Sequence, residues 1–421
     1  MNIDVDNYGN YFISVKPLNN IMVLITPLKP YIPVNPEEFC TNPYDIISKE
    51  EEQELKKIPE SLVHLILPSG EGDEIYQNAA KAYENFKEKK IVVQEESPSI
   101  FVYRQESTNF SHQGLIMGVA LRDYEDGNIV KHEHTREIPL KDRTNHIMST
   151  NVAAGLVWTV FQANKKIKVL IETIKKKEPK FDFKKYGYRN LLWQETDPNT
   201  IQKLVKLFSN KKIYIADGHH RAASAAEYRK FKLKESNVDK DIEAPWQYLL
   251  SYVASDDQIR ILPYNRVIRK LPLSEADFLK RLEDDFQIMS MKNGFNPTKK
   301  NEIAICLNGN WYKLLVRNKK FQTKRDSLDV AIVQDKILEP ILNIKDPRSN
   351  ENIFFVGGMQ DPKEMEKFII NKGNALLINL YPVDIRDLEL IADKGGVMPP
   401  KSTWFDPKVL SGLILHDLGE N

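Results

Sequence analysis

The sequence has few cysteines, no long apolar run and almost no net charge, and each shortage excludes a class of protein. Its two cysteines, Cys40 and Cys306, are too few for a disulfide framework or a thiolate metal site, and they suit a reducing cytosol. Apolar runs such as IMVLITPL are far shorter than the ~18 residues of a membrane helix, and the N-terminus MNIDVDNYGN has no apolar signal region. With 60 basic and 59 acidic residues the net charge is +1, which argues against a nucleic-acid-binding protein. We therefore expect a soluble cytoplasmic protein with neither a membrane nor a nucleic acid as its partner.

Several common catalytic signatures are also missing. The chain has no G-x-x-x-x-G-K-[ST] P-loop, no G-x-G-x-x-G after a strand, no H-E-x-x-H and no G-x-S-x-G. Any phosphate or nucleotide chemistry must therefore use a less common scaffold.

The pattern of apolar residues predicts a mixed α/β (α+β) protein. Short apolar runs alternate with amphipathic segments over all 421 residues, which is enough chain for two or three domains. Helices are expected to begin near Asp73, at Asp197 and at Ser274, where a capping residue precedes apolar residues at helical spacing. Strands are expected at 61–67, 99–105, 114–121, 155–162, 212–216, 247–253, 302–307 and 375–380.

The distribution of histidine suggests where the chain divides. Seven of the eight histidines precede a stretch near 265–275, and one, His416, follows it. We therefore expect a catalytic domain at 1–268 and a second α/β domain at 269–421. The polar C-terminal segment of this second domain is expected to return to the catalytic site.

The segment IYIADGHHRAASA, residues 213–225, is the strongest candidate for a site. It predicts a buried strand that ends at Asp217, a turn at Gly218 and a helix rich in alanine, with Asp217 as a candidate N-cap. His219, His220 and Arg221 then occupy the first helical turn. A helix N-terminus attracts anions, particularly phosphate, and favours neutral histidine. The alternative is a plain cap followed by exposed histidines, but this combination of residues favours a site.

A second cluster lies in KHEHTREIPLKDRTNHI, residues 131–147. Its ionisable residues are His132, Glu133, His134, Arg136, Asp142, Arg143 and His146. His-x-His is a metal-ligand spacing when it lies on a strand, whereas the arginines would suit direct binding of phosphate. A polar loop between strands is the alternative, and the neighbouring Asp-Gly-His-His-Arg segment makes the functional interpretation the better one.

Two further segments carry polar residues in rigid surroundings. In MPPKSTWFDPK, residues 398–408, two prolines precede Lys401, Ser402 and Thr403, a cation and two hydroxyls that suit a phosphate or form a rigid turn. In NPYDIISKEE, residues 42–51, Asp45 precedes a helix that Ser48 would cap. A lone aspartate in such a place is usually structural.

Together the segments NPYDIIS, KHEHTR, DRTNHI, IADGHHRAASA, SLDV, FVGG and MPPKSTWFDPK resemble a family catalogued as a domain of unknown function and associated with free L-serine kinases, including pyrophosphate-dependent ones. The Asp-Gly-His-His-Arg segment also resembles that of the smaller ADP-dependent serine kinases, which share a fold with the ParB and sulfiredoxin group. The resemblance implies a ParB/sulfiredoxin-like catalytic core, a Mg²⁺ cofactor, and L-serine and pyrophosphate as substrates. It also implies a place in serine metabolism and cysteine biosynthesis, through O-phosphoserine.

The resemblance also implies roles for the candidate residues. Asp45, Asp217 and His220 would be catalytic, with Asp45 the first choice for the general base and Asp217 for Mg²⁺ or a structural role. Glu133, Ser402 and Thr403 would contact the substrate, and Glu133 is also a reserve for the base or the metal ligand. The donor phosphates would be bound by Gly218, His219, Arg221, His132, His134, Arg136, Arg143, His146 and Lys401.

Three alternatives remain open from the sequence. The donor could be ADP or ATP, because adenine pockets often leave no motif. The histidines and Asp217 could instead hold the metal of a phosphoester hydrolase. A DNA-binding protein by analogy with ParB is disfavoured by the charge balance. The sequence leaves the oligomeric state open and is compatible with a monomer.

Overall fold

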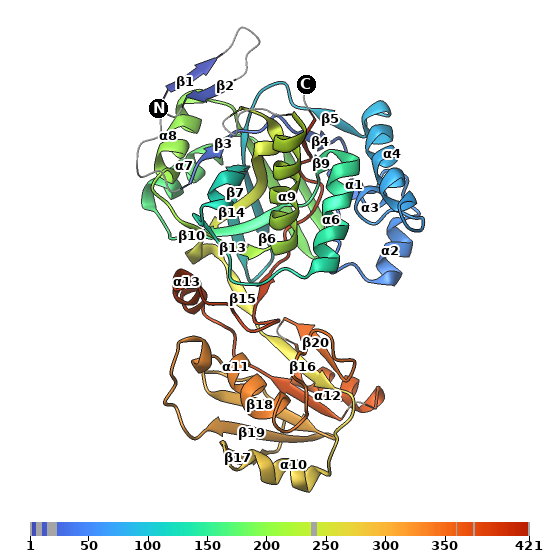
Figure 1. Cartoon of the computed structure of the whole chain (residues 1–421), viewed down its shortest axis with the longest axis vertical. Helices are drawn as coiled ribbons and strands as arrows, with labels where there is room; N and C mark the ends of the chain where they lie inside the picture. The colour runs from blue at the N-terminus through green and yellow to red at the C-terminus, as the bar shows by residue number, and fades with distance from the viewer. Residues whose placement is uncertain are drawn as a thin grey trace. The chain divides into compact units, whose positions relative to one another are not determined.

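The computed structural model describes residues 2–5, 11–14, 23–236, 242–358, 360–373 and 375–419. The chain forms two compact units, shown in Figure 1. Unit 1 comprises Met1–Ile259 and Pro407–Asn421, and unit 2 comprises Arg260–Asp406. The units thus divide nine residues before the boundary expected at 268, and the chain returns to unit 1 for its last fifteen residues. The expected mixed α/β architecture is confirmed.

A mixed nine-stranded sheet forms the centre of unit 1. Its strand order is β11 (Phe181–Lys185), β12 (Tyr188–Glu195), β6 (Ile100–Glu106), β7 (Ser111–Ala120), β14 (Tyr248–Ser255), β10 (Val157–Phe161), β13 (Ile213–Asp217) and β8 (Ile129–Val130), with β3 (Ile25–Thr26) pairing with β7. The β10–β14 and β13–β8 pairs are parallel, and the others are antiparallel. The five strands expected between residues 99 and 253 all belong to this sheet.

Helices surround the sheet and complete its core. They are α1 (Pro36–Phe39), α2 (Lys49–Leu55), α3 (Val63–Ile66), α4 (Glu74–Glu88), α5 (Leu121–Glu125), α6 (Glu137–Thr150), α7 (Lys165–Ile174), α8 (Pro198–Phe208) and α9 (His219–Ser236). The main hydrophobic cluster joins sheet residues such as Ile215 to Ile171 of α7, Phe208 of α8 and Ala222 of α9. In Figure 1, α6 and α9 run side by side over the sheet. Small side chains on α9 allow this helix to pack closely.

Most expected helix starts are confirmed by hydrogen bonds of the capping residue. The Asp197 carboxylate accepts the N–H of Thr200 at the start of α8, and Ser48 Oγ accepts the N–H of Glu51 at the start of α2. The expected strand at 61–67 is wrong, because Val63–Ile66 is helical. An apolar run this short does not distinguish a strand from a buried helical turn by its periodicity.

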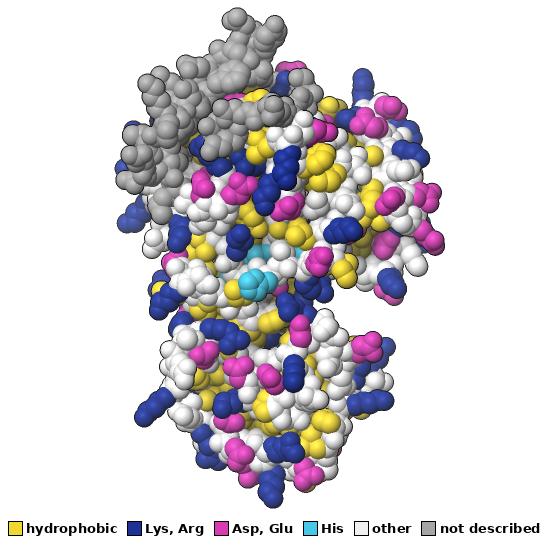
Figure 2. Space-filling view, viewed as in Figure 1, with side chains coloured by type: hydrophobic (Ala, Val, Ile, Leu, Met, Phe, Trp, Pro, Cys, Tyr) yellow, Lys and Arg dark blue, Asp and Glu magenta, His cyan; other side chains and the backbone are white. Residues whose placement is uncertain are grey.

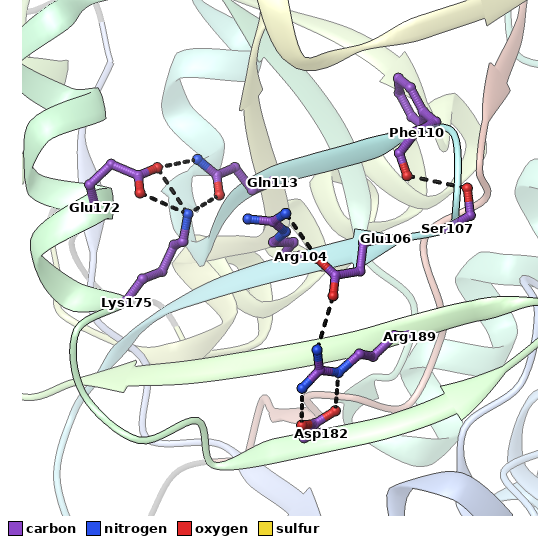
Figure 3. Close-up of polar contacts among 9 residues, drawn as sticks. All are labelled: Arg104, Glu106, Ser107, Phe110, Gln113, Glu172, Lys175, Asp182 and Arg189. Atoms are coloured by element: carbon purple, nitrogen blue, oxygen red, sulfur yellow. Dashed lines mark hydrogen bonds and ion pairs between the residues drawn. The ribbon is translucent and has the colours of Figure 1, made fainter.

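Polar contacts hold the outer strands of this sheet to each other and to α7 (Figure 3). Arg189 of β12 pairs through its Nη2 with Asp182 of β11 at 2.6 Å and through its Nη1 with Glu106 of β6 at 3.2 Å. Lys175 caps the C-terminal end of α7, where its Nζ lies 2.9 Å from Glu172 Oε1 and donates to Gln113 Oε1 of β7 at 2.7 Å. These contacts stabilise the exposed end of the sheet.

The C-terminal segment is bound to unit 1 by main-chain hydrogen bonds along its length. Ser411 forms a bridge with Thr41, the N–H of Gly412 donates to Ala154 O at 3.1 Å, and Leu415 forms a bridge with Tyr31. Small two-stranded sheets complete unit 1. They are β23 (His416–Asp417) with β9 (Val152–Ala153), β4 (Tyr31–Pro33) with β5 (Val92–Gln94), and β1 (Asn2–Val5) with β2 (Tyr11–Ser14).

Unit 2 is built on a six-stranded antiparallel sheet. Its order is β17 (Phe286–Met291), β19 (Asn310–Val316), β18 (Glu302–Leu307), β21 (Leu376–Asn379), β16 (Tyr264–Ile268) and β20 (Ile353–Gly357). A separate pair joins β15 (Arg260–Leu262) to β22 (Trp404–Asp406). The helices are α10 (Glu275–Leu282), capped by Ser274 as expected, α11 (Asp329–Val333), α12 (Pro362–Asn371) and α13 (Ile385–Asp393). The strands expected at 302–307 and 375–380 are β18 and β21.

Among the residues that the structure describes, no helix is long and apolar enough to cross a membrane. Basic and acidic side chains are interspersed over the described part of the face drawn in Figure 2, in keeping with the near-neutral net charge.

Candidate anion-binding site

The candidate site of unit 1 is built at the turn between β13 and α9. A bulge in the β10–β13 pairing shifts the register, so that Asp217 lies opposite Trp158 while Ile215 lies opposite Thr159. Gly218 then turns the chain with a φ of 97°, a conformation that favours glycine, and α9 begins at His219. The bulge and the turn together place the Asp217 carboxylate beside the first turn of the helix.

Two cations clamp that carboxylate. Arg221 Nη2 donates to Asp217 Oδ2 at 2.8 Å, and Lys408 Nζ donates to Oδ1 at 2.6 Å. The side chains are largely buried, at 8% exposure for Lys408, 15% for Arg221 and 20% for Asp217. Burial alone would raise the pKa of the Asp217 carboxyl, but Lys408 and Arg221 hold that pKa well below its usual range. The sequence predicted Asp217 as a candidate N-cap and a candidate catalytic or Mg²⁺-binding residue; the structure places its carboxylate between two cations.

Arg221 is held rigidly by the backbone around it. Its Nη1 donates to the carbonyl of Leu156, and its side chain crosses two glycines. A Cβ on Gly218 would lie 3.1 Å from the guanidinium carbon, and a Cβ on Gly155 would lie 3.2 Å from the Arg221 Cδ. The two glycines therefore make room for this side chain.

Lys408 is a residue of the site that sequence reasoning missed. It follows β22 and begins the return of the chain into unit 1, where Gln105 Nε2 of β6 donates to its carbonyl at 3.4 Å. His112 Nε2 lies 3.0 Å from Gln105 Oε1, and the Tyr252 hydroxyl lies 2.9 Å from His112 Nδ1, so a buried polar chain orients that amide. Lys408 is the last residue of the segment MPPKSTWFDPK, which the sequence analysis singled out, but no role was predicted for this lysine.

Two histidines beside the clamp are buried and neutral. His132 is 3% exposed and His219 is 6% exposed, and their ring centroids lie 4.5 Å apart. Burial lowers the pKa of His132 to about 4, and burial and the neighbouring His132 lower that of His219 well below its usual value. His132 Nδ1 and His219 Nε2 have no hydrogen-bond partner among the described residues. These two nitrogens are buried polar atoms without a partner in the described part of the chain.

The other members of the 131–136 segment lie nearer the surface. This segment is irregular rather than the strand on which the metal-ligand interpretation depended. His220 Nε2 accepts the N–H of Arg136 at 3.0 Å, so this nitrogen ties the segment to α9 and is not open to a substrate proton. Glu133 Oε2 lies 3.9 Å from His219 Nδ1, and His134 and the Arg136 side chain are exposed.

Arg143 on α6 connects this region to the 42–48 segment. Its guanidinium lies 4.4 Å from the centroid of the Tyr44 ring, and its Nε and Nη2 donate to Asp142 Oδ2 at 2.8 and 2.6 Å. Asp45, next to Tyr44, is exposed. His146 lies one turn along α6, where its Nε2 is 2.7 Å from the carbonyl of Leu65 and burial lowers its pKa to about 4. His146 Nε2 is thus engaged by the main chain, the residue also lines the pocket of unit 1, and its donor-binding role stays a prediction.

A pocket of about 760 Å³, including solvent at its mouth, opens between these elements. Arg221 and Ser224 of α9, Arg143 of α6, Tyr44 and Ser411 contribute its polar lining. Apolar and aromatic side chains such as those of Trp246 and Leu249 form much of the remainder. The structure thus brings the 42–48, 142–147 and 217–225 segments, far apart in the sequence, to one cavity of unit 1.

The described residues do not form a metal site of their own. They contain no group of three or more histidine, cysteine, aspartate or glutamate side chains arranged to hold a metal ion. Both oxygens of Asp217, the residue predicted to bind Mg²⁺, already accept hydrogen bonds from cations. The described residues of unit 1 therefore do not fit a Mg²⁺ held by protein side chains alone.

The remaining predicted residues belong to unit 2. Lys401 is exposed and has a φ of 54°, and its Nζ lies 5.2 Å from the centroid of the Tyr264 ring. Ser402 is buried and its Oγ donates to the carbonyl of Pro399 at 2.5 Å, so this hydroxyl shapes its own loop. Thr403 is partly exposed. The participation of these three residues in substrate binding stays a prediction.

The clamp has a clear electrostatic consequence. One carboxylate faces two cations, so the cluster keeps one positive charge, and it does so at the positive end of the eighteen-residue helix α9. A helix N-terminus, a guanidinium, an ammonium and neutral imidazoles form a set suited to a multiply charged oxyanion. The fold and the site therefore define a mixed α/β protein with a candidate anion-binding turn between a strand and a helix.

Comparison with known proteins identifies the family. Residues 26–331 match the family described as protein of unknown function (DUF1015), and the chain belongs to this family. No curated protein matches the sequence.

Solved structures resemble the chain only weakly. A conserved hypothetical protein from Pyrococcus furiosus is 12% identical, with a TM-score of 0.34 over 71% of this chain and 95% of its own. A free serine kinase in complex with AMP is 10% identical, with a TM-score of 0.35 over 69% and 86%. SbnI from Staphylococcus aureus, truncated at its C-terminus, is 11% identical, with a TM-score of 0.36 over 70% and 85%. At TM-scores this low, we draw no conclusion on fold or function from these likenesses.

Proposed function

We propose that this protein is a kinase that transfers a phosphoryl group from inorganic pyrophosphate to free L-serine. The serine hydroxyl oxygen attacks one phosphorus of pyrophosphate, the bond from that phosphorus to the bridging oxygen breaks, and phosphate leaves. The hydroxyl proton passes to a general base, and the products are O-phosphoserine and phosphate. The proposal combines the motif resemblance to free L-serine kinases with the chemistry of the site in unit 1.

The observation that carries this proposal is the clamp of Arg221 and Lys408 on Asp217. Phosphoryl transfer needs mainly positioning of the donor and neutralisation of its charge. Pyrophosphate is small and highly charged, and the clamp of one carboxylate and two cations lies beside the positive end of α9. Because Asp217 holds both cations in place before the donor binds, little reorganisation is needed when the anion arrives.

The buried histidines supply hydrogen bonds to the donor without adding charge. His132 and His219 are neutral at pH 7 because burial lowers the pKa of each. Their partnerless nitrogens, Nδ1 and Nε2, lie in adjacent rings next to the clamp. We assign them to the phosphate oxygens of the donor or of the leaving phosphate.

The general base in this proposal is Asp45. Asp217 is a poor candidate, because its lowered pKa and its two cationic partners make it a weak base. Asp45 is exposed and lies beside Tyr44, whose ring packs on Arg143 at the pocket. A carboxylate in this place would accept the proton of a serine hydroxyl bound in the pocket.

Mg²⁺ enters this proposal as part of the substrate. Mg²⁺ is usually held by substrate phosphates together with one or two carboxylates. Since the part of unit 1 that the structure describes holds no cluster of three metal-ligating side chains, we assign the ion to the magnesium complex of pyrophosphate. The same proposal includes three further expectations from the sequence. They are donor binding by Lys401, a ParB/sulfiredoxin-like core and a cytoplasmic location.

The test is a comparison of phosphoryl donors. The purified protein is mixed with L-serine, Mg²⁺ and, separately, pyrophosphate, ADP or ATP, and O-phosphoserine is measured by mass spectrometry. Product with pyrophosphate alone is the expected result. Product only with ADP or ATP would replace the donor and keep the site. If no donor gives product, the kinase proposal is wrong, and hydrolysis of phosphoesters by the metal-loaded protein would be measured next.

A further inference from the structure

A row of buried polar side chains crosses the sheet of unit 1 and ends at the main chain of Lys408. Gln105 of β6 and His112 of β7 lie directly opposite each other in the antiparallel pairing, and Tyr252 belongs to β14, the next strand. None of these three side chains is more than 2% exposed. Gln105 Nε2 donates to the carbonyl of Lys408 at 3.4 Å. His112 Nε2 lies 3.0 Å from Gln105 Oε1, and His112 Nδ1 lies 2.9 Å from the Tyr252 hydroxyl.

The hydrogen-bonding chemistry of the row fixes its direction. A main-chain carbonyl only accepts, so Gln105 must turn its NH₂ group to Lys408 and its Oε1 to His112. The imidazole must then carry its proton on Nε2, which leaves Nδ1 to accept the O–H of Tyr252. Burial raises the pKa of the Tyr252 phenol well above its usual value, so the hydroxyl keeps the proton that it donates. A flipped Gln105 amide would place oxygen against oxygen and N–H against N–H, and the row therefore admits one orientation of this amide.

Close packing keeps the imidazole and the phenol in place. The His112 ring stacks on the Trp158 indole, with ring centroids 5.3 Å apart and an angle of 24° between the ring planes. A Cβ on Gly114 would lie 2.7 Å from a carbon of the Tyr252 ring, so this glycine makes room for the phenol. Trp158 is also the residue opposite Asp217 in the β10–β13 pairing. The row and the carboxylate of the clamp thus belong to one tightly packed region of unit 1.

The main chain of Lys408 is fixed on both sides of its Cα. Pro407 precedes it, is buried and has a φ restricted by its ring, while Gln105 holds the carbonyl that follows. A lysine side chain has a flexible four-carbon stem, so its ammonium stays in one place only if the start of that stem is fixed. The stem of Lys408 ends 2.6 Å from Asp217 Oδ1, with the side chain 8% exposed. Holding this carbonyl therefore also limits where the ammonium can lie.

We propose that Gln105, held in one orientation by His112 and Tyr252, is a positioning residue that fixes the main chain of Lys408, so that the Lys408 ammonium stays on Asp217 and faces the phosphoryl donor. The part that concerns the donor rests on the proposed function. The fixing of Lys408 on Asp217 does not depend on it.

Gln113 offers a matched control on the neighbouring position of β7. Consecutive residues of a strand point to opposite faces of the sheet, so Gln113 lies on the other face from His112. Its Nε2 donates to Glu172 Oε1 at 2.8 Å, and its Oε1 accepts from Lys175 Nζ at 2.7 Å (Figure 3). Gln113 is thus also a buried glutamine that holds a lysine, but that lysine is remote from the clamp in the sheet order.

The first experiment measures how fast the lysines of the full chain are acetylated by a limited amount of an amine-reactive ester, with the modified peptides quantified by mass spectrometry. The reagent needs an exposed, uncharged amine, so Lys408 should react slowly while it is held on Asp217. In Gln105→Leu the carbonyl of Lys408 loses its donor, and we expect Lys408 to react about tenfold faster or more. Q105L should leave the rate at Lys175 unchanged, whereas Q113L should raise the rate at Lys175 and not at Lys408.

Tyr252→Phe is the milder second variant, because it keeps the packed ring and removes only the hydroxyl. It frees His112 to change tautomer, so we expect a smaller acceleration at Lys408, about threefold. An unchanged rate at Lys408 in both Q105L and Y252F would overturn the positioning role. An equal rise at Lys408 and Lys175 in Q105L would overturn it as well, since that result means a general loosening of unit 1.

The second experiment measures pyrophosphate affinity by calorimetry in a double-mutant cycle. Q105L should weaken binding about tenfold in the wild-type background and less than about twofold in the K408M background, because Gln105 acts through Lys408. Equal losses in both backgrounds would indicate a purely structural role and overturn the proposal. This assay needs no turnover, so a protein that shows the expected cycle but forms no O-phosphoserine would refute the proposed function and leave this inference standing. If the wild type binds no pyrophosphate, the part that concerns the donor is refuted, and the acetylation rates still decide whether Gln105 fixes Lys408.

Discussion

Replacing Lys408 by Met tests the anion-binding clamp most directly. The substitution keeps an unbranched side chain and removes the ammonium that lies 2.6 Å from Asp217 Oδ1. Removing one partner of a fully buried ion pair destabilises a protein by about 3–5 kcal/mol. Asp217 keeps Arg221 and is 20% exposed, so we expect the smaller cost of one charge-assisted hydrogen bond, about 2 kcal/mol. Urea unfolding of the variant and of the wild type measures this difference.

The same substitution should also weaken donor binding, by a free energy comparable to its effect on folding. It takes the charge of the clamp from +1 to zero at the place where the pyrophosphate is proposed to bind. We expect pyrophosphate to bind ten- to a hundredfold more weakly, corresponding to about 1.4–2.8 kcal/mol. Isothermal titration calorimetry with magnesium pyrophosphate gives the affinity, and serine phosphorylation at saturating donor gives kcat.

Lys175 provides the control for this experiment (Figure 3). The Lys175 side chain is 12% exposed, and its Nζ contacts Glu172 and Gln113. This residue lies at the C-terminal end of α7 and not at the β13–α9 turn. K175M should cost less than about 1 kcal/mol, because Glu172 is half exposed, and it should leave pyrophosphate affinity unchanged. If K408M lowers stability but binds pyrophosphate as the wild type does, Lys408 is structural and the reasoning fails. Equal losses of affinity in K408M and K175M would refute it as well.

Three further predictions follow from the same contacts and pKa shifts. Asp45→Asn should lower kcat at least about a hundredfold with little change in the KM for pyrophosphate. Asp217→Asn should mainly raise the KM for pyrophosphate. If steady-state kinetics show the reverse pattern, Asp217 is the general base. Burial lowers the pKa of His146 and His416 to about 4. Protonation of each histidine therefore lowers the free energy of unfolding by roughly 3 kcal/mol as the pH falls from 6.5 to 4. The urea midpoints measured at pH 7.5 and at pH 4.5 should differ less in His416→Gln than in the wild type. Burial raises the pKa of Asp329 to about 7, so ionisation of this carboxyl lowers the stability of unit 2 by on the order of 4 kcal/mol as the pH rises from 4 to 7. Asp329→Asn should therefore slow hydrogen exchange in unit 2 at pH 8. Faster exchange in this variant would show that the ionised carboxylate stabilises unit 2, contrary to the prediction.

The local elements were largely predictable because each has a short-range cause. Asp197 and Ser274 begin α8 and α10 through hydrogen bonds to their own helices, and the apolar run at 213–216 forms β13. The failure at 61–67 has a physical reason too, since four or five buried apolar residues fit a helical turn as well as a strand. The segment Asp217–Arg221 was recognisable because a glycine, two histidines and an arginine at a helix start have no common structural purpose.

The partners within the site were not predictable, because they depend on segments that meet only in the folded chain. Lys408 lies 191 residues from Asp217 in the sequence, and nothing local marks it as the second cation of the clamp. The role of His220 likewise depends on a hydrogen bond from the backbone of Arg136, 84 residues away. The pocket is formed by residues from Tyr44 to Leu418, and its existence follows from sheet order rather than from any one motif.

The sequence alone determined the mixed α/β class and most element positions, because these follow from periodicity, capping and residue chemistry within a few positions. Anion binding at the start of α9 stays a prediction. The tertiary structure decided which charges neutralise one another, which histidines are buried and neutral, and that Arg221 and Lys408 both pair with Asp217. Charge and burial are properties of the folded surroundings, since the energy of a carboxylate or an imidazole depends on groups and solvent within a few ångströms, whatever their distance along the chain.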